Sequence, residues 1–355
     1  MRRISAQPLL VFATILAGGV LCAPPVSAHE KWFHATEGFP LRWDLLFQVK
    51  PLAFVGGVLL LTALLGLWWR VRGGRGFVPG PENFGADPER RSALYGLIPA
   101  ILAVHLAVPL LVNGVQGHLF SPDNTLPGAW RYFLGLAETG LALALFYGTL
   151  TRLAAALMAL LWLIGIFVTG PQGMLDNIFY LGFAAFFFLA GRGPLSIDRL
   201  VIPHWEASPA QMERAVPALR IGLGLSLTIV AFTEKLANLP LALDFLQDYH
   251  LNFTRFFGLP MSNEVFVLCA GSVELLVGLC LLFNIFPREI ILIAWIPINM
   301  SLTVFNWTEL IGHLPIYGIL AFLLLWSPGP ENLALWREGL RSGPLPIKPK
   351  LLGRE

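Results

Sequence analysis

Two glutamates interrupt long apolar stretches of the sequence and are the residues best suited to do chemistry. Glu138 lies in the run Gly-Leu-Ala-Glu-Thr-Gly-Leu, and Glu274 lies in Ala-Gly-Ser-Val-Glu-Leu-Leu. A carboxylate at membrane depth is costly and usually faces a protein interior or a water-filled cavity. Each acid is therefore expected to be either ionised beside a cation, with Arg131 and Lys235 available, or neutral because burial disfavours the charged form. A neutral acid suits proton exchange. The alternative is a structural hydrogen bond between helices.

The composition places these acids in a membrane protein. Of the 355 residues, 56% are apolar and 13% are charged, and the mean hydropathy is +0.68. These values are typical of a polytopic membrane protein, so membrane lipid is the expected surrounding and no nucleic acid is expected as a partner. The sequence holds no CxxC, CxxCH or zinc-type cysteine spacing. It therefore lacks the usual signatures of dithiol redox chemistry, c-type haem and structural zinc.

An N-terminal leader and nine apolar segments define the expected topology. Residues 1–28 contain two arginines, an apolar stretch and a final Val-Ser-Ala, as in a secretory signal peptide. An uncleaved anchor is the alternative. Most of the later apolar segments are close in length to the roughly 20 residues that a bilayer-spanning helix requires. They lie near residues 51–69, 93–113, 131–149, 152–170, 175–191, 216–234, 264–286, 289–306 and 313–327.

The distribution of lysine and arginine orients these segments. With the mature N-terminus outside, the inner segments hold sixteen of these residues and the outer segments hold six, as the positive-inside rule requires. We therefore expect a multi-pass protein of the bacterial inner membrane, with a periplasmic mature N-terminus and a cytoplasmic C-terminus. Residues 29–91 then comprise a periplasmic segment, the first spanning helix and a cytoplasmic loop. Residues 331–355 form a solvated cytoplasmic tail.

The two acids belong to a repeated pattern. Each is followed by a similar apolar-loop-apolar run, and corresponding residues lie 136 to 137 positions apart. This predicts an all-α transmembrane bundle of two tandem four-helix units, residues 92–200 and 216–330, after one N-terminal helix. Because each unit has an even number of helices, the copies share one orientation and are related by an axis along the membrane normal. Chance likeness between apolar helices is the alternative.

Three short motifs of the second unit point to a known family. The first helix contains Gly-Leu-Gly-Leu-Ser from Gly222 and ends in Phe-Thr-Glu-Lys-Leu, and Glu274 begins Glu-Leu-Leu-Val-Gly-Leu-Cys-Leu-Leu-Phe before a turn at Pro287. In these motifs the unit resembles the DoxX/DoxD membrane proteins, whose lysine would be Lys235. Phe232 stands where the family usually has glycine, and the first unit departs further. The resemblance implies a four-helix membrane unit, and some relatives are subunits of thiosulfate:quinone oxidoreductase.

Further polar groups gather toward the same outer side as the two acids. Asp176, Lys235 and His313 join Glu138 and Glu274 as catalytic candidates, because they combine useful chemistry with positions near the repeated acids. The candidate contacts for a quinone cofactor are Tyr180, Tyr317 and His118. The quinone would lie in an apolar slot lined by aromatic residues such as Trp162, Phe167, Phe179 and Tyr180.

The start of the mature chain carries a candidate metal site. Cleavage after Ala28 would leave His29 as the first residue, with His34 five positions on. A free amino terminus and two imidazoles suit copper, and a periplasmic end is accessible to it. The alternative is an amphipathic segment in the membrane interface, anchored by its aromatic residues.

Three functions from different classes follow from these observations. The first is a quinone-facing subunit of a membrane redox system, in which Glu138 or Glu274 accepts protons. The sequence has no haem, flavin or iron-sulfur motif, so electrons would need a redox partner subunit or a substrate that reacts directly with quinone. The second is a non-catalytic membrane scaffold or assembly factor whose acids lock helices together. The third is a transporter of small solutes or ions whose repeats rock about a central site.

Overall fold

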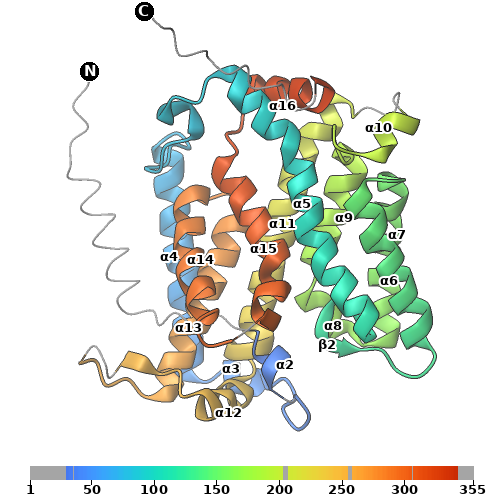
Figure 1. Cartoon of the computed structure of the whole chain (residues 1–355). Helices are drawn as coiled ribbons and strands as arrows, with labels where there is room; N and C mark the ends of the chain where they lie inside the picture. Colours follow the sequence, from blue (N-terminus) through green and yellow to red (C-terminus); the bar gives the residue numbers. More distant parts are fainter. Residues whose placement is uncertain (1–28, 35, 203–206, 255–257, 306, 343–355) are drawn as a thin grey trace, which may run out of the picture.

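The computed structural model describes residues 29–34, 36–202, 207–254, 258–305 and 307–342. The predicted signal peptide and the end of the predicted tail lie outside these residues. The described chain is a bundle of helices with one short antiparallel hairpin of two strands (Figure 1). It is a membrane protein, because six of its helices are long and apolar enough to cross a bilayer. These are α4 (Val49–Val71), α5 (Pro88–Gln116), α7 (Thr151–Val168), α11 with its extension (Pro209–Leu236), α13 (Asn263–Leu282) and α15 (Trp307–Leu325).

The expectation of nine spanning helices is confirmed only for these six. The other three segments are helical but fall short in length or apolar character. Helix α6 (Trp130–Tyr147) has 18 residues and contains Arg131 and Glu138, α9 (Phe179–Ala190) has 12 residues, and α14 (Pro287–Ser301) has 15. Two charged residues lower the mean hydropathy of α6, and α9 and α14 are shorter than a spanning helix requires, although all three segments are helical.

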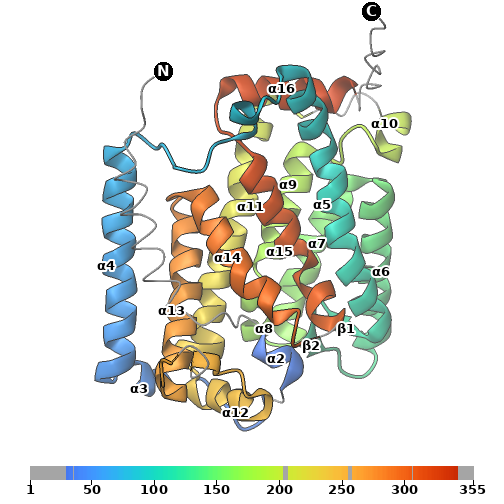
Figure 2. The same cartoon turned by 60° about the vertical axis from the view of Figure 1, so that its left-hand side comes forward.

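Shorter elements connect the long helices or cover their ends. At one end of the bundle lie the helices α2 (Glu30–Phe33), α3 (Trp43–Leu46) and α12 (Leu239–Tyr249), and at the other lie α10 (Ile197–Val201) and α16 (Pro330–Ser342) (Figures 1 and 2). The remaining elements are η1 (Pro81–Phe84), β1 (His118–Leu119), β2 (Ser121–Thr125), α8 (Pro171–Asp176) and the π-helical η2 (Ala231–Leu236) that extends α11 (Pro209–Val230).

The long helices form two four-helix groups with the same order of neighbours. In the first, α5 packs on α6, α6 on α7 and α7 on α9. In the second, α11 packs on α13, α13 on α14 and α14 on α15. The last helix of each group packs against the first helix of the other, α9 on α11 and α15 on α5. This reciprocal contact is the arrangement that a two-fold relation between the groups would give.

The turn between the second and third helices has the same backbone in both groups. Gly148 and Asn284 have positive φ angles of 65° and 56°, and Leu150 and Phe286, just before α7 and α14, have φ angles of 48° and 44°. Both pairs are 136 positions apart, and left-handed residues other than glycine are uncommon. The duplication itself stays a prediction, and this shared turn is the local feature that agrees with it.

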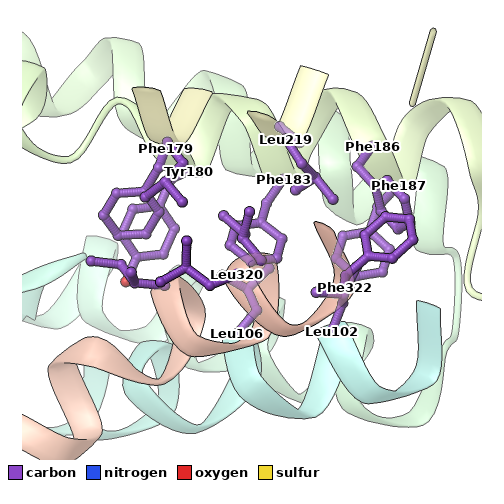
Figure 3. Close-up of a cluster of buried hydrophobic side chains, with 14 of the residues drawn as sticks. Leu102, Leu106, Phe179, Tyr180, Phe183, Phe186, Phe187, Leu219, Leu320 and Phe322 are labelled. Carbon is purple, nitrogen blue, oxygen red and sulfur yellow. The ribbon is translucent and has the colours of Figure 1, made fainter. Parts of the chain in front are cut away.

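The core lies where the two groups meet. Aromatic side chains of α9 fill the space between α5, α11 and α15, with Phe183, Phe186 and Phe187 fully buried (Figure 3). Inside a bilayer the lipid is as apolar as the side chains, so such a core is held by close packing rather than by exclusion of water. Close approach is permitted by small residues. A Cβ atom on Gly114 of α5 would lie 2.8 Å from the carbonyl oxygen of Gly135 on α6.

Helix α4 stands at the edge of the bundle and packs mainly on α13 (Figure 2). Its exposed large side chains are mostly leucine, with a valine at each end, which suits contact with lipid.

The predicted solvated tail is wrong for the part that the structure describes. Residues from Pro330 form α16, which packs on α5, and the Trp336 side chain is fully buried. The charged residues of this segment suggested a solvated chain, but one apolar face of the helix covers the end of the bundle.

Candidate functional site

A cluster of buried charges surrounds Lys235 at the end of the bundle where α2 lies. The Lys235 ammonium Nζ is 3.2 Å from Oε2 of Glu274, 3.6 Å from Oε2 of Glu234 and 3.7 Å from Oε1 of Glu30. All four side chains are buried. The structure therefore pairs the predicted acid of α13 with the predicted lysine and adds two carboxyl groups that the sequence did not single out.

The π-helical turn η2 makes this geometry possible. In a regular α-helix successive side chains point about 100° apart, so neighbouring residues rarely all face inward. In η2 the widened turn leaves Thr233, Glu234 and Lys235 all buried. Single π-type turns inside α-helices are rare, and those that do occur are often found at functional sites.

The start of the described chain inserts into this cluster. The His29 Nδ1 atom lies 3.1 Å from Oε1 of Glu234, and the backbone N–H of Glu30 donates to Oε2 of the same carboxylate at 3.1 Å. The Lys31 ammonium forms an ion pair with Asp176. Helix α2 is therefore held at this end of the bundle by buried polar contacts.

Asp176 at the end of α8 links α2 to α11. One oxygen of its carboxylate pairs with Lys31, and the other accepts a hydrogen bond from the Thr233 hydroxyl at 2.7 Å. Its backbone carbonyl accepts a hydrogen bond from the Ser226 hydroxyl. Asp176 was predicted from sequence as a site residue, and it belongs to the same buried network as Lys235.

A stack of aromatic rings closes the other side of the cluster. The His29 ring lies 4.3 Å from the Trp32 ring and 5.3 Å from the His313 ring, measured between centroids. The His313 Nδ1 atom lies 3.0 Å from the backbone carbonyl of Glu309, and because a carbonyl can only accept, Nδ1 carries the proton. Gly312 leaves room for this stack, since a Cβ atom there would lie 2.2 Å from the Trp32 ring.

The buried cluster contains more carboxyl groups than cations. Two ammonium groups and two imidazoles, from Lys31, Lys235, His29 and His313, face five buried carboxyl groups. Among the described residues the two lysines balance only two of these five acids, and an uncompensated charge in such surroundings is expensive. Protons held by imidazole or carboxyl groups must therefore supply the remaining positive charge, and two such protons are needed even if His29 carries a free α-ammonium group. The five acids are Glu30, Asp176, Glu234, Glu274 and Glu309.

Two groups of α2 have strongly altered acidities. Burial raises the pKa of Glu30 to about 8, although the charge of Lys235 acts in the opposite direction. Burial by itself would lower the pKa of His29, but the negative charge of Glu234 and its hydrogen bond outweigh that effect, so the pKa of His29 is raised. A carboxyl group and an imidazole that both have raised pKa values and lie in one buried cluster are suited to exchanging protons.

Glu138, the acid of the first group, has different surroundings. Its side chain is fully buried, and Oε1 accepts a hydrogen bond from the backbone N–H of Phe120 at 2.9 Å. The carbonyl of Phe120 in turn accepts from the Tyr180 hydroxyl at 2.8 Å. Within the described residues Glu138 forms no ion pair, with Arg131 or any other cation, and Oε2 has no hydrogen-bond partner. These surroundings favour the neutral acid.

The candidate quinone contacts do not converge on Lys235. Tyr180 is buried beside the hairpin that holds Glu138. The Tyr317 hydroxyl donates to the side chain of Asn299 at 3.3 Å, and His118 lies on β1 near Thr125. The tyrosines occupy corresponding places in sequence, but each meets a different partner in its own group of helices.

The aromatic residues expected to line a slot are partly packed and partly exposed. Trp162 is buried and donates its indole N–H to the carbonyl of Met174 at 2.8 Å, and Phe179 stacks on Tyr180 at 4.4 Å. Phe167 is 88% exposed. The cavity beside Glu30 and Lys235 has a volume of only about 10 Å³, about enough for one water molecule. A quinone ring could reach the cluster only if a covering element such as α2 moved.

The two histidines of the predicted copper site point to different acids. His29 contacts Glu234, whereas His34 lies 3.0 Å from Asp244 and 3.1 Å from Asp248 of α12. Among the described residues no group of three or more His, Cys, Asp or Glu side chains is arranged to hold a metal ion. The two imidazoles therefore do not fit a shared copper ion.

Sequence reasoning missed four members of the cluster as site residues, namely Glu30, Lys31, Glu234 and Glu309. The adjacent Glu234 and Lys235 at the end of an apolar segment were a usable signal, because two successive charges there call for partners. No comparable signal marks Glu30, since a short charged segment before the first long helix is usually solvated.

Comparison of the chain with protein-family models, with curated proteins and with solved structures found no match. The resemblance to DoxX/DoxD proteins therefore stays a prediction.

Proposed function

We propose that this membrane protein is a quinone-facing subunit of a membrane redox system and that the cluster around Lys235 exchanges protons with the quinone. The observation that carries the proposal is that five buried carboxyl groups surround only two lysine ammonium groups. Even with an α-ammonium group on a mature His29, two further protons must be held by imidazole or carboxyl groups of the cluster, and these are the protons that can be exchanged. The quinone itself comes from the resemblance to DoxX/DoxD proteins.

Each group has a distinct role in this proposal. Oxidation of a quinol to a quinone releases two electrons and two protons, and the electrons would pass to a redox partner subunit. Lys235 provides a fixed positive charge that favours a negatively charged oxygen nearby. Glu274, in contact with Lys235, would accept the two protons one after the other, and Glu30 would pass each of them toward the end of the bundle. A pKa of about 8 for Glu30 lets that carboxyl group gain and lose a proton near neutral pH.

We place the site near the periplasmic side of the bacterial inner membrane. In this arrangement the leader is removed, the mature N-terminus is periplasmic, the C-terminus is cytoplasmic, and α6, α9 and α14 span the membrane with the six longer helices. The proposal is supported by the position of α16 and α10 at the end opposite α2 (Figure 1), since several of the arginines assigned to the cytoplasm lie in or beside those two helices.

A second candidate is a scaffold or assembly factor in which the same groups only hold helices together. It is favoured by the sequence separation of the contacts. His29 and Glu234 are 205 residues apart, and Lys31 and Asp176 are 145 apart. Such links would fix the ends of the bundle without any chemistry. A transporter with two rocking units is the remaining alternative.

Titration of the purified protein with a quinone analogue separates these candidates. We expect Glu274→Gln to weaken binding of the analogue about tenfold or more, because it removes a charged partner from a buried network. The matched control is Glu264→Gln, at the start of the same helix, where the carboxylate forms an exposed pair with Lys50. Unchanged affinity in Glu274→Gln and Glu138→Gln would exclude the proton role. A loss of folded protein with unchanged affinity would favour the scaffold.

A further inference from the structure

A cavity lined by arginines lies at the end of the bundle opposite the Lys235 cluster. Its volume is about 260 Å³, just below the about 300–1,000 Å³ of sites for drug-sized ligands, so it has room for a small head group. We call it the arginine pocket. It lies between α7, the loop after α9, α10 and α16, and its charged lining residues are Arg152, Arg192, Asp198, Arg199, Arg337 and Arg341.

Among the described residues that line the arginine pocket, basic side chains outnumber acidic ones. Five arginines face one carboxylate, Asp198. That carboxylate is itself occupied at the start of α7, where it accepts a hydrogen bond from the backbone N–H of Thr151 at 2.8 Å. An excess of guanidinium groups around a small cavity is the arrangement that binds phosphate groups.

Arg192 provides the strongest single indication. Its Nε and Nη2 atoms donate to the carbonyls of Leu145 and Phe146 at 3.0 Å each, at the end of α6. The remaining nitrogen, Nη1, is buried and has no hydrogen-bond partner among the described residues. The whole side chain is only 6% exposed. Burial lowers the pKa of Arg192 to about 10, so the group is still charged at neutral pH and calls for an anion.

The surroundings of the arginine pocket suit a lipid. Helix α10 beside it exposes the apolar side chains of Leu200 and Val201, which are 83% and 71% exposed, and Leu195 in the preceding loop is 51% exposed. Apolar side chains beside basic groups at the end of membrane helices are typical of a surface that touches both acyl chains and head groups.

We propose that the arginine pocket binds the phosphate of an anionic phospholipid head group, with Arg192 and Arg337 as its principal contacts. The same chemistry would accept a soluble phosphate, so the experiment must separate the two sources. The proposal concerns a site distant from the Lys235 cluster and does not depend on the proposed redox function.

The test compares lipid retention by the purified full-length chain and its variants. The protein is placed in nanodiscs of phosphatidylcholine alone or with added phosphatidylglycerol or cardiolipin, and retained lipid is measured by native mass spectrometry alongside thermal unfolding. We expect the wild-type protein to retain the anionic lipid and to unfold at a higher temperature with it. Arg337→Gln should weaken retention about fivefold, as expected for one basic side chain near a membrane surface. Arg192→Met should weaken it at least as much.

Arg214→Gln is the matched control, because Arg214 is exposed on α11 and does not line the arginine pocket. Arg192 also holds the end of α6, so Arg337→Gln decides the question if Arg192→Met fails to fold. The proposal would be overturned if Arg337→Gln retained as much anionic lipid as the wild type, or if Arg214→Gln lost as much lipid as Arg337→Gln. Stabilisation of the wild-type protein by inorganic phosphate but not by anionic lipid would overturn the lipid assignment.

Discussion

Replacement of Lys235 by methionine is the sharpest test of the buried cluster. Methionine keeps most of the length of the lysine side chain but removes the ammonium group that lies within 3.2 to 3.7 Å of three carboxyl groups. The acids then lose their shared cation. Removing one partner of a buried ion pair typically costs about 3–5 kcal/mol, because the remaining charge is left without compensation.

A similar loss of stability is expected if Glu274 becomes protonated in the variant. If Glu274 takes up a proton instead of remaining as an unpaired anion, the protein must protonate a group with an ordinary pKa of about 4.3 at pH 7. A difference of about 2.7 units at about 1.4 kcal/mol each gives about 4 kcal/mol. We therefore expect Lys235→Met to lower the free energy of unfolding by about 4 kcal/mol at pH 7. The loss should be smaller at pH 5, because protonation then costs less.

Unfolding of the purified protein in detergent, at pH 7 and at pH 5, measures this effect. Lys50→Met is the control, since Lys50 forms an exposed pair with Glu264 and such pairs contribute little. The double variant Lys235→Met/Glu274→Gln should recover part of the lost stability, because it also removes the charge of Glu274. The recovery should be incomplete, because Glu30 and Glu234 remain without their cation. A Lys235→Met protein that is as stable as wild type at both pH values, or equally destabilised at both, would refute the reasoning.

Three further predictions follow from the same contacts. Gly312→Ala should displace α2, because the added Cβ would lie 2.2 Å from the Trp32 ring; faster hydrogen exchange in α2 is the expected result, and unchanged exchange would contradict it. Docking of α2 should weaken as the pH rises from 5 to 8, since His29 and Glu30 both have raised pKa values in the folded state and therefore favour folding at low pH; exchange that slows with rising pH, after correction for its intrinsic rate, would show that the sign is wrong. Glu138→Gln should change the melting temperature little, because an amide can accept the same backbone hydrogen bond as a neutral acid, and a large loss would mean that the carboxyl group is ionised.

Part of the candidate site could be predicted, because the free-energy cost of placing a charged side chain in a membrane depends only on the sequence around that residue. An acid in an apolar segment, such as Glu138 or Glu274, must be sheltered wherever the helix packs, and both are buried. Lys235 could be named as a partner because it ends a neighbouring apolar segment. The different chemistry of the two acids could not be read from sequence. It depends on whether a cation or the backbone of Phe120 reaches the carboxyl group.

The sequence alone predicts a helical membrane protein, the positions of most of its long helices, and the acids that must be buried in protein. These properties follow from hydropathy and charge along a short stretch of chain. Three contacts could be seen only in the folded protein: residues 29–31 are buried at one end of the bundle, five carboxyl groups gather around two lysines, and arginines line a pocket at the opposite end. The physical reason is that these sites join residues far apart in the chain, such as His29 and Glu234, 205 positions apart. Their meeting depends on how whole helices pack and on the π-helical turn that directs neighbouring charges inward.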